Sequence, residues 1–184
     1  MGIFSDSLDK ATANTLTRPL PKSPQAQMRF LVKTAKGTRA AAETLGISQR
    51  TVERYLKGQI KQPRPDLATR LVDEVRRRWQ PRVRERAKRH AATTGGIVIE
   101  TRARFGFTAA PGTTDDARIR LITQQLPPDY AARLLDAHAV GATDQQLQEI
   151  AAEGLQEVYF KDRGQRAPGL RVAFTDIDYV ELGF

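Results

Sequence analysis

The sequence predicts an α+β protein, with an all-helical domain over residues 1–91 and a smaller mixed α/β domain with an antiparallel sheet over residues 92–184. Apolar residues recur at helical spacing through most of the first region. From Ile97 onward the apolar period changes to two, which is typical of a half-buried strand. Between the two regions lies the stretch Ala-Thr-Thr-Gly-Gly, residues 92–96, where we expect a flexible joint and the domain boundary.

The composition favours a protein that binds a polyanion. The 184 residues carry a formal net charge of +9, the sequence pI is about 10.2, and 40% of the residues are hydrophobic, which is enough to build a core. A basic excess of this kind is the electrostatic footprint of nucleic-acid binding. Cysteine is absent, which excludes disulfides and thiolate chemistry, and two histidines, His90 and His138, are too few for a histidine metal site.

No apolar run in the sequence is long enough to span a membrane, and no signal-peptide core is present at its start. We therefore expect a cytoplasmic protein without membrane contact, and one that binds no metal or cofactor of its own.

The first two helices can be placed by their start and stop signals. A helix is expected over residues 1 to about 16, because Phe4 and Leu8 fall on one side of it. The prolines of residues 17–24 end it. Ser23 and the proline after it form a capped helix start, and the helix that follows should pack against the next stretch.

The stretch Gly37–Gly58 predicts two short helices joined by a tight turn. Gly46 can take the left-handed conformation that ends the first helix, and the Ser48 hydroxyl can cap the second. This arrangement is typical of a helix-turn-helix, which we place at residues 38–57. The residues expected inside the helix pair are Ala41, Ala42, Leu45, Val52, Tyr55 and Leu56.

The second of these helices offers polar side chains to the outside. A recognition helix reads base edges with its N-terminal residues, and Arg can bridge guanine as Gln can bridge adenine. The alternative is a helical hairpin within a core, with Arg50 and Arg54 merely solvated. The predicted DNA-contacting residues are Gln49, Arg50, Thr51, Arg54 and Lys57.

A basic helix is expected over residues 66–90, with Asp66 as its cap, and Pro81 should kink or end it. Leu67, Leu71, Val75 and Trp79 form its apolar stripe. From Arg76 to Arg89 the sequence has eight basic residues and one acid, Glu85. A solvated helix face is the usual explanation of such a run. Phosphate contact is favoured here because the basic residues of the run so far outnumber the acidic ones. The eight residues are Arg76, Arg77, Arg78, Arg82, Arg84, Arg86, Lys88 and Arg89.

The second domain should contain a β-hairpin. Residues 97–108 alternate between apolar and charged side chains, and residues 109–116 form the turn. Residues 117–123 are expected as the second strand, with Ile119 and Leu121 on its apolar face. A helix capped by Asp116 is the alternative for this segment.

The remaining sequence predicts two helices and a strand. The first helix covers residues 126–141, Thr143 caps the second, and a strand with a bulge near Thr175–Asp176 covers residues 170–182. From Thr143 onward the sequence has eight acidic residues and only four basic ones. This acidic half should contact a protein, or a second copy of the chain, rather than DNA.

The residues alone indicate a binding protein and not an enzyme. The sequence contains no phosphate-binding loop, nucleophile elbow or dinucleotide fingerprint. Asp115–Asp116, and Asp176 with Asp178, could be metal-binding carboxylates or ordinary turn and edge charges.

The chain resembles, almost end to end, the telomere terminal proteins of linear Streptomyces-type chromosomes and plasmids. The resemblance is carried by LGISQRTVERY (residues 45–55), PRPDLATRL (63–71), RRRWQPRVR (76–84), ATTGGIVIETRARFGF (92–107), GTTDDARIR (112–120), LPPDYAARLLDA (126–137) and EIAAEGLQEVYF (149–160).

The resemblance implies a protein primer that stays covalently attached to the 5′ ends of linear DNA and is nucleoid-associated at replicon ends. The priming residue of the family is a threonine, and the matching stretch assigns it to Thr114, with Asp115 as an assisting carboxylate. The implied partners are the telomeric DNA end with its single-stranded 3′ overhang, a telomere-binding recruiting protein, and a DNA polymerase. The polymerase complex would supply Mg²⁺ and the dNTP.

Other hydroxyls and other functions remain open at this point. Thr113 is the nearest rival of Thr114, and Thr93 and Thr94 are further rivals, whereas Tyr55 should be buried. The rival function is a helix-turn-helix transcription regulator or plasmid partition or replication-control protein with a C-terminal dimerisation domain. A third is an enzyme with nucleotidyl-transfer activity of its own.

Overall fold

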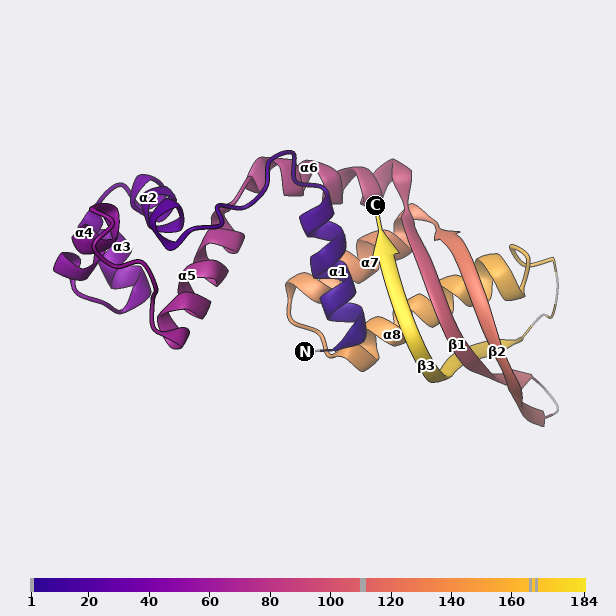
Figure 1. Ribbon diagram of the computed structural model, residues 1–184. Coiled ribbons are helices and arrows are strands. Elements are labelled where there is room, and N and C mark those ends of the chain that lie inside the picture. Colours follow the sequence, from indigo (N-terminus) through magenta and orange to yellow (C-terminus); the bar gives the residue numbers. More distant parts are fainter. Residues whose placement is uncertain (1, 110–111, 166, 168) are drawn as a thin grey trace. The chain divides into compact units, whose positions relative to one another are not determined.

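The computed structural model describes residues 2–109, 112–165, 167 and 169–184, and for residues 109 and 112–117 it describes the backbone alone. Over these residues the protein has the predicted α+β fold, with helices mainly in the N-terminal half and an antiparallel sheet in the C-terminal half (Figure 1). The helices are α1 (Ile3–Asn14), α2 (Pro24–Ala35), α3 (Thr38–Leu45), α4 (Gln49–Leu56), α5 (Pro65–Arg78), α6 (Pro81–His90), α7 (Pro128–Ala139) and α8 (Asp144–Leu155). The strands are β1 (Ile97–Ala109), β2 (Gly112–Leu126) and β3 (Arg171–Gly183), and two π-helical turns are η1 (Ala91–Gly95) and η2 (Gln156–Phe160).

Packing divides the chain into two compact units. We call Thr17–Pro81 the helical unit, and Met1–Leu16 together with Arg82–Phe184 the αβ unit. The helical unit is thus inserted in the sequence of the αβ unit. This grouping differs from the expected division after residue 91, because α1 and α6 both fall in the αβ unit.

The sheet has the strand order β2-β1-β3 with antiparallel pairs throughout. The predicted alternation of β1 is confirmed, since Ile97, Ile99 and Phe105 are fully buried while Arg102 and Arg104 are exposed. Two register shifts in the β1–β3 ladder leave residues 175 and 178 of β3 without a partner in β1. They confirm the predicted bulge, which shifts the alternation of β3.

The expected phase of β2 is wrong. Ile119 and Leu121 are 41% and 68% exposed, whereas Ile122 and Leu126 are buried. The register with β1 sets this phase, because Arg120 and Ile122 pair with the buried residues Ala103 and Thr101, so the even-numbered residues from 120 to 126 face inward. The Arg120 guanidinium lies on the inner side instead, with its Cζ 5.7 Å from the centroid of the Phe160 ring.

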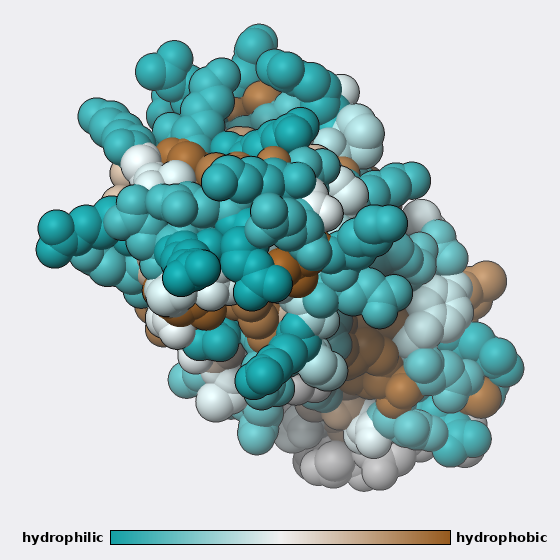
Figure 2. Space-filling model, turned by 60° about the vertical axis from the view of Figure 1, so that its left-hand side comes forward, coloured by the Kyte–Doolittle hydropathy of each residue, from teal (hydrophilic) through white to brown (hydrophobic). Residues whose placement is uncertain are grey.

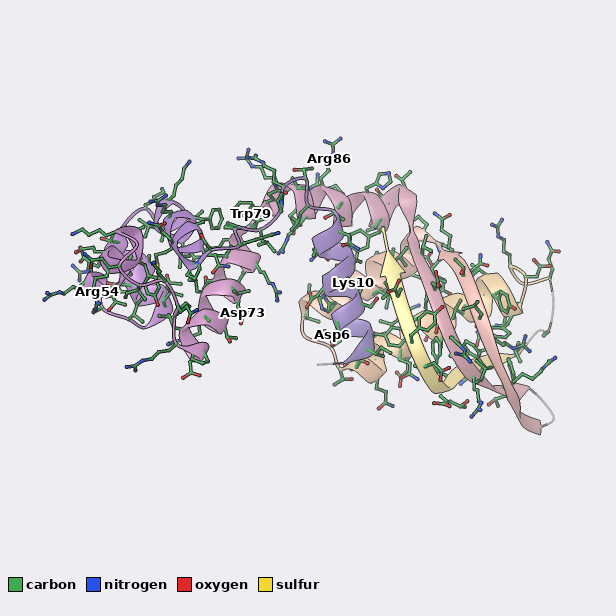
Figure 3. All side chains as sticks on the ribbon, viewed as in Figure 1. Asp6, Lys10, Arg54, Asp73, Trp79 and Arg86 are labelled. Carbon is green, nitrogen blue, oxygen red and sulfur yellow. The ribbon has the colours of Figure 1, made fainter. Side chains whose placement is uncertain are left out.

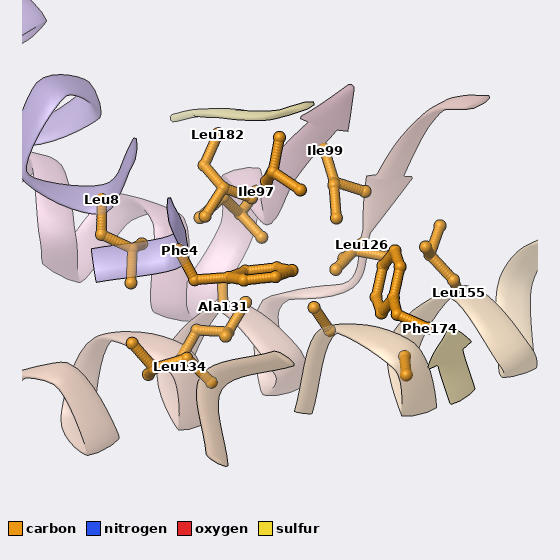
Figure 4. Close-up of a cluster of buried hydrophobic side chains, with 14 of the residues drawn as sticks. Phe4, Leu8, Ile97, Ile99, Leu126, Ala131, Leu134, Leu155, Phe174 and Leu182 are labelled. Carbon is orange, nitrogen blue, oxygen red and sulfur yellow. The ribbon is translucent and has the colours of Figure 1, made fainter. Parts of the chain in front are cut away.

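Helices cover the inner face of the sheet, and α1 joins them from the other end of the sequence. Phe4 and Leu8 of α1 are fully buried in a core with β1, β3, α7 and α8 (Figure 4). Asp144, the first residue of α8, caps α1, because its Oδ1 accepts from the amide N of Phe4 and of Ser5, both at 2.9 Å. The Ser7 Oγ accepts from the amide N of Leu182 at 2.7 Å. These contacts explain why α1 packs in the αβ unit.

Most of the stretch expected as a flexible joint, residues 92–95, lies in the π-helical turn η1. The π-helical turn η1 continues directly from α6, and β1 begins after Gly96. Gly96 has a φ of +69°, and a Cβ at this position would lie 2.2 Å from the carbonyl O of Leu126. A side chain is therefore excluded at this position by both conformation and space.

The helical unit has a core of its own, which contains Met28, Leu31, Leu45, Val52 and Leu71, each fully buried. The ends of the unit are tied together. Gln80 Oε1 accepts from the amide N of Thr17 at 3.0 Å, and Trp79 Nε1 donates to the carbonyl O of Arg18 at 3.0 Å.

The basic stretch expected as one helix over residues 66–90 forms two. The first begins one residue earlier than expected, at Pro65, so that Asp66 lies in its first turn instead of capping it. The Trp79–Gln80 segment separates α5 from α6, and Gln80 has a φ of +47°. Pro81 therefore ends α5, as predicted, and it also begins α6.

Candidate nucleic-acid interface

The turn between α3 and α4 has the predicted backbone conformation. Gly46 ends α3 with a φ of +63°, where a residue without a Cβ has little steric cost. Ser48 caps the start of α4, because its Oγ accepts a hydrogen bond from the amide N of Thr51 at 3.2 Å. The action of this pair as a DNA-binding helix-turn-helix over residues 38–57 stays a prediction.

Burial fixes the inner face of α4. Val52 is fully buried and Tyr55 is 2% exposed, both within the core of the helical unit. Desolvation by burial raises the pKa of the Tyr55 phenol. Tyr55 is therefore buried as predicted, and its hydroxyl is inaccessible to a nucleotide. The opposite face of α4 is left for contact with a partner.

Three basic side chains form a stripe on that outer face. Arg50, Arg54 and Lys57 are exposed and spaced four and three residues apart, which places them on one side of a helix. None of the three has an ion pair among the described residues. They line a hollow of roughly 390 Å³ together with Glu53 and Gln59. In Figure 3 the Arg54 side chain projects from the outer side of α4.

The other two residues predicted on α4 have partners within the helix. Gln49 Nε2 donates to Glu53 Oε1 at 3.1 Å. The Thr51 side chain is half-buried, and its Oγ1 lies 2.9 Å from Ser48 Oγ. Base contact by Gln49 would require it to leave Glu53, whereas the basic stripe is free to bind as it stands.

The basic residues at the end of α5 are not equivalent. Glu74 accepts from Arg77 at 2.5 Å and from Arg78 at 2.9 Å, and the Glu74 side chain is only 18% exposed. The hydrogen bond from Arg77 is the main reason why the pKa of Glu74 is lowered. Arg76 is exposed and has no ion pair among the described residues. Of these three predicted contacts, Arg76 is the one best able to meet a phosphate.

The other five predicted contacts lie on α6, in the αβ unit. This helix has no buried residue. Arg82, Arg86 and Arg89 are exposed at helical spacing, while Arg84 and Lys88 are half-buried. Figure 3 shows Arg86 pointing away from the unit. Since the two units pack separately, the basic run is divided between them and not displayed on one helix.

The positive charge of the protein is concentrated in the helical unit. Residues 17–81 contain 15 Lys and Arg against 5 Asp and Glu, a net charge of +10. The αβ unit contains the remaining 15 bases and 16 acids, a net charge of −1. The face of the helical unit in Figure 2 is largely hydrophilic. The boundary expected after residue 91 separates the charge in the same sense, with a net charge of +13 before it and −4 after it.

The structure describes the backbone of the predicted priming residues. Thr114 and Asp115 lie in β2, opposite Phe107 and Gly106 of β1. The turn expected over residues 109–116 is therefore mostly strand, and its remaining part, residues 110–111, lies outside the described residues. The side chains of Thr113, Thr114 and Asp115 also lie outside the described part of the structure.

The rival threonines Thr93 and Thr94, and two further tyrosines, have definite surroundings. Thr93 and Thr94 are exposed in η1, and Thr93 Oγ1 donates to the carbonyl O of Arg89 at 2.8 Å. Tyr159 is 42% exposed. Tyr179 donates to Glu100 at 2.8 Å, and this hydrogen bond is the main cause of its raised pKa.

The carboxylates of β3 act as partners of arginine. Arg104 Nη1 lies 3.3 Å from Asp176 Oδ2, and Arg102 Nε lies 3.3 Å from Asp178 Oδ2. Of the two interpretations of Asp176 and Asp178, the structure therefore supports edge charges. In the part of the chain that the structure describes, no group of three His, Asp or Glu side chains could hold a metal ion.

No protein-family model, no curated protein and no solved structure matches this chain. Within the described residues, none of the helices is both long enough and apolar enough to cross a lipid bilayer.

Proposed function

We propose that this protein is a DNA-binding terminal protein that primes DNA synthesis at the ends of linear replicons. The observation that supports DNA binding best is the net charge of +10 on the helical unit, together with the unpaired basic stripe of α4. Binding at the DNA end would bring the priming hydroxyl to its template.

In this proposal the α4 stripe reads DNA in the major groove. Arg50 lies in the first turn of α4, where a recognition helix contacts base edges. Arg54 and Lys57 follow on the same side of the helix. Arg76 and the exposed arginines of α6 supply phosphate contacts, which are independent of sequence and weaken as salt is raised.

The priming part of the proposal rests on the resemblance and assigns the acceptor hydroxyl to Thr114. The Thr114 oxygen attacks the α-phosphate of the first dNTP, so that a phosphodiester bond to the protein forms and the bond to the β-phosphate breaks. Pyrophosphate leaves, and the hydroxyl proton passes to a base in the polymerase site. The polymerase supplies the Mg²⁺ ions that stabilise the attacking and leaving oxygens. The protein is thus a substrate, recruited to the telomere by a DNA-binding partner and located at nucleoid replicon ends.

The backbone of the hairpin supports this assignment. Thr114 is the third residue of β2, and only the pairs at Thr108 and Ala109 lie between its pair and the end of the hairpin. In Figure 1 the paired ends of β1 and β2 extend beyond the helices of the αβ unit. A narrow two-stranded projection is a shape that a polymerase site built for a primer strand could accept.

The test is nucleotide attachment in the presence of the polymerase and a labelled dNTP. Thr114→Ala should abolish the label that survives nuclease treatment, while Thr113→Ala, the same change one residue away, should retain it. Label lost only in Thr113→Ala would move the site by one residue, and label retained in both would refute the hairpin assignment. Sequence-specific dimeric binding without any covalent nucleotide would favour the transcription regulator instead.

A further inference from the structure

A groove of roughly 850 Å³ lies in the αβ unit, between α8 and the first residues of β3. The α8 wall includes Gln148, Glu149 and Glu153, Gln156 of η2 continues it, and the facing wall is the segment from Arg171 to Thr175. Figure 1 shows α8 passing behind the sheet and β3 at the edge of the sheet. DNA binding and priming, as proposed above, make no use of this groove.

The groove runs along an open strand edge. Because β3 pairs only with β1, the backbone groups of alternate β3 residues point away from the sheet. Two glutamine side chains, one from α8 and one from η2, form hydrogen bonds with two of these backbone groups. Gln156 Oε1 accepts from the amide N of Val172 at 2.9 Å, and Gln148 Nε2 donates to the carbonyl O of Phe174 at 3.3 Å.

A glutamine amide offers the same donor and acceptor as a peptide unit. The two glutamines therefore stand where the backbone of a neighbouring strand would stand. An added strand could replace both hydrogen bonds one for one, so that opening the edge would leave no backbone group unsatisfied. At the other end of β3 the edge is closed, because α1 packs there and Ser7 binds the amide N of Leu182.

Charged side chains on both walls bear on the choice of the incoming segment. Glu149 and Glu153 line the α8 wall, Arg171 lies at one end of the facing wall, and all three side chains are exposed. Arg133 already pairs with Glu153 at 2.6 Å, whereas Glu149 has only a long hydrogen bond of 3.3 Å from Gln145. Glu149 is therefore the carboxylate available to a cation.

We propose that this groove is a docking site for an extended basic peptide segment of a partner protein. The segment adds to β3 as a fourth strand, in the manner of strand addition to an exposed sheet edge. Alternate side chains of an added strand face α8, so a Lys or Arg at those positions would meet Glu149. The proposal is independent of the DNA-binding and priming functions.

The probe for this proposal is a fluorescein-labelled seven-residue peptide that alternates Lys and Val, titrated against the whole chain and followed by fluorescence anisotropy. A peptide of the same sequence with methylated amide nitrogens at alternate positions has the same charge but cannot pair with a strand edge. A Glu-Val peptide tests the sign of the charge. The Lys-Val peptide should bind, and the other two should not.

A matched pair of variants locates the site. Glu149→Lys should weaken binding of the Lys-Val peptide at least about tenfold by placing like charges together. Asp136→Lys makes the same charge change at an exposed residue of α7 outside the groove, and it should leave binding unchanged. Equal binding of the methylated peptide, equal loss in both variants, or no binding of the Lys-Val peptide would each overturn the proposal. The proposal does not rest on DNA binding or priming, so failure here would not touch the proposed function.

Discussion

Ser7 is a buried polar residue whose loss should be costly. It is 6% exposed, and its Oγ is the acceptor for the amide N of Leu182. Ser7→Ala would leave that amide without a partner inside the αβ unit, which typically costs about 1–3 kcal/mol. We expect a lower free energy of unfolding, measured by urea denaturation followed by circular dichroism. Ser5→Ala, a change to a half-buried hydroxyl two residues away, should cost less; an equal loss would show that the Ser7 hydrogen bond is not the cause.

Glu74 should give the helical unit a measurable pH dependence. Its pKa is lowered from 4.5, first by the hydrogen bond from Arg77, so the folded state favours the carboxylate. The stabilisation is therefore present above pH 4.5 and is lost as the pH falls through the lowered pKa. It should be modest, because Arg77 is 68% exposed and water screens the pair.

The measurement compares the protein with Glu74→Gln by urea unfolding at pH 7 and pH 3, using the fluorescence of Trp79, the single tryptophan. The stability difference between the two proteins should shrink at the lower pH. A difference that stays constant would mean that the ion pairs of Glu74 contribute nothing.

Among the α-helices that the structure describes, α6 is the one without a buried residue, and its charge should govern the salt dependence of DNA binding. Arg→Gln at Arg82, Arg86 and Arg89 preserves helix propensity and removes three candidate phosphate contacts. The slope of log affinity against log salt should fall by about 0.9 for each phosphate that the variant no longer neutralises. Fluorescence anisotropy with labelled duplexes of two unrelated sequences measures this slope. The same change at Lys161, Arg163 and Arg171 is the control, and an identical slope in both triple variants would exclude α6 from the interface.

Elements defined by local signals could be predicted from the sequence. Ser23 and Ser48 cap α2 and α4, Thr143 caps α8 with a complete capping box, and Gly46 ends α3, because each signal acts within one turn of chain. The packing of α1 could not be predicted, since the residues that cap and hold it are about 140 to 175 positions away. The phase of β2 could not be predicted for a similar reason, because the register with β1 decides which of its side chains face the core.

Part of the candidate interface could also be predicted from the sequence. The outer stripe of α4 follows from helical spacing, and the structure keeps Arg50, Arg54 and Lys57 together. The division of the basic run does not follow from local sequence, because it depends on which helices pack with which core. The groove beside β3 left no local signal, since its walls meet only when α8 packs against the sheet.

For the whole molecule, the separation of charge predicts where DNA affinity resides. A fragment of residues 17–81 has its own core and carries the net charge of +10, although 65 residues make a marginal domain. We expect it to unfold cooperatively, as monitored by Trp79 fluorescence, and to bind duplex DNA at low salt. The slope of its log affinity against log salt should be smaller than that of the whole chain, because the fragment lacks the phosphate contacts of α6. A folded fragment with no DNA affinity would contradict the assignment of the interface to the helical unit.

The insertion of the helical unit also fixes an order of events during synthesis on the ribosome. The segment that forms α1 is made first, but its partners in β3 are made more than 150 residues later. The core of the helical unit is built from residues within 17–81, so this unit can fold while β1 is still being translated. Until β3 emerges, the core that α1 enters is incomplete, and Phe4 and Leu8 lack part of their packing. Rare codons or pauses in the second half of the message should therefore lower the yield of the αβ unit while leaving the helical unit folded.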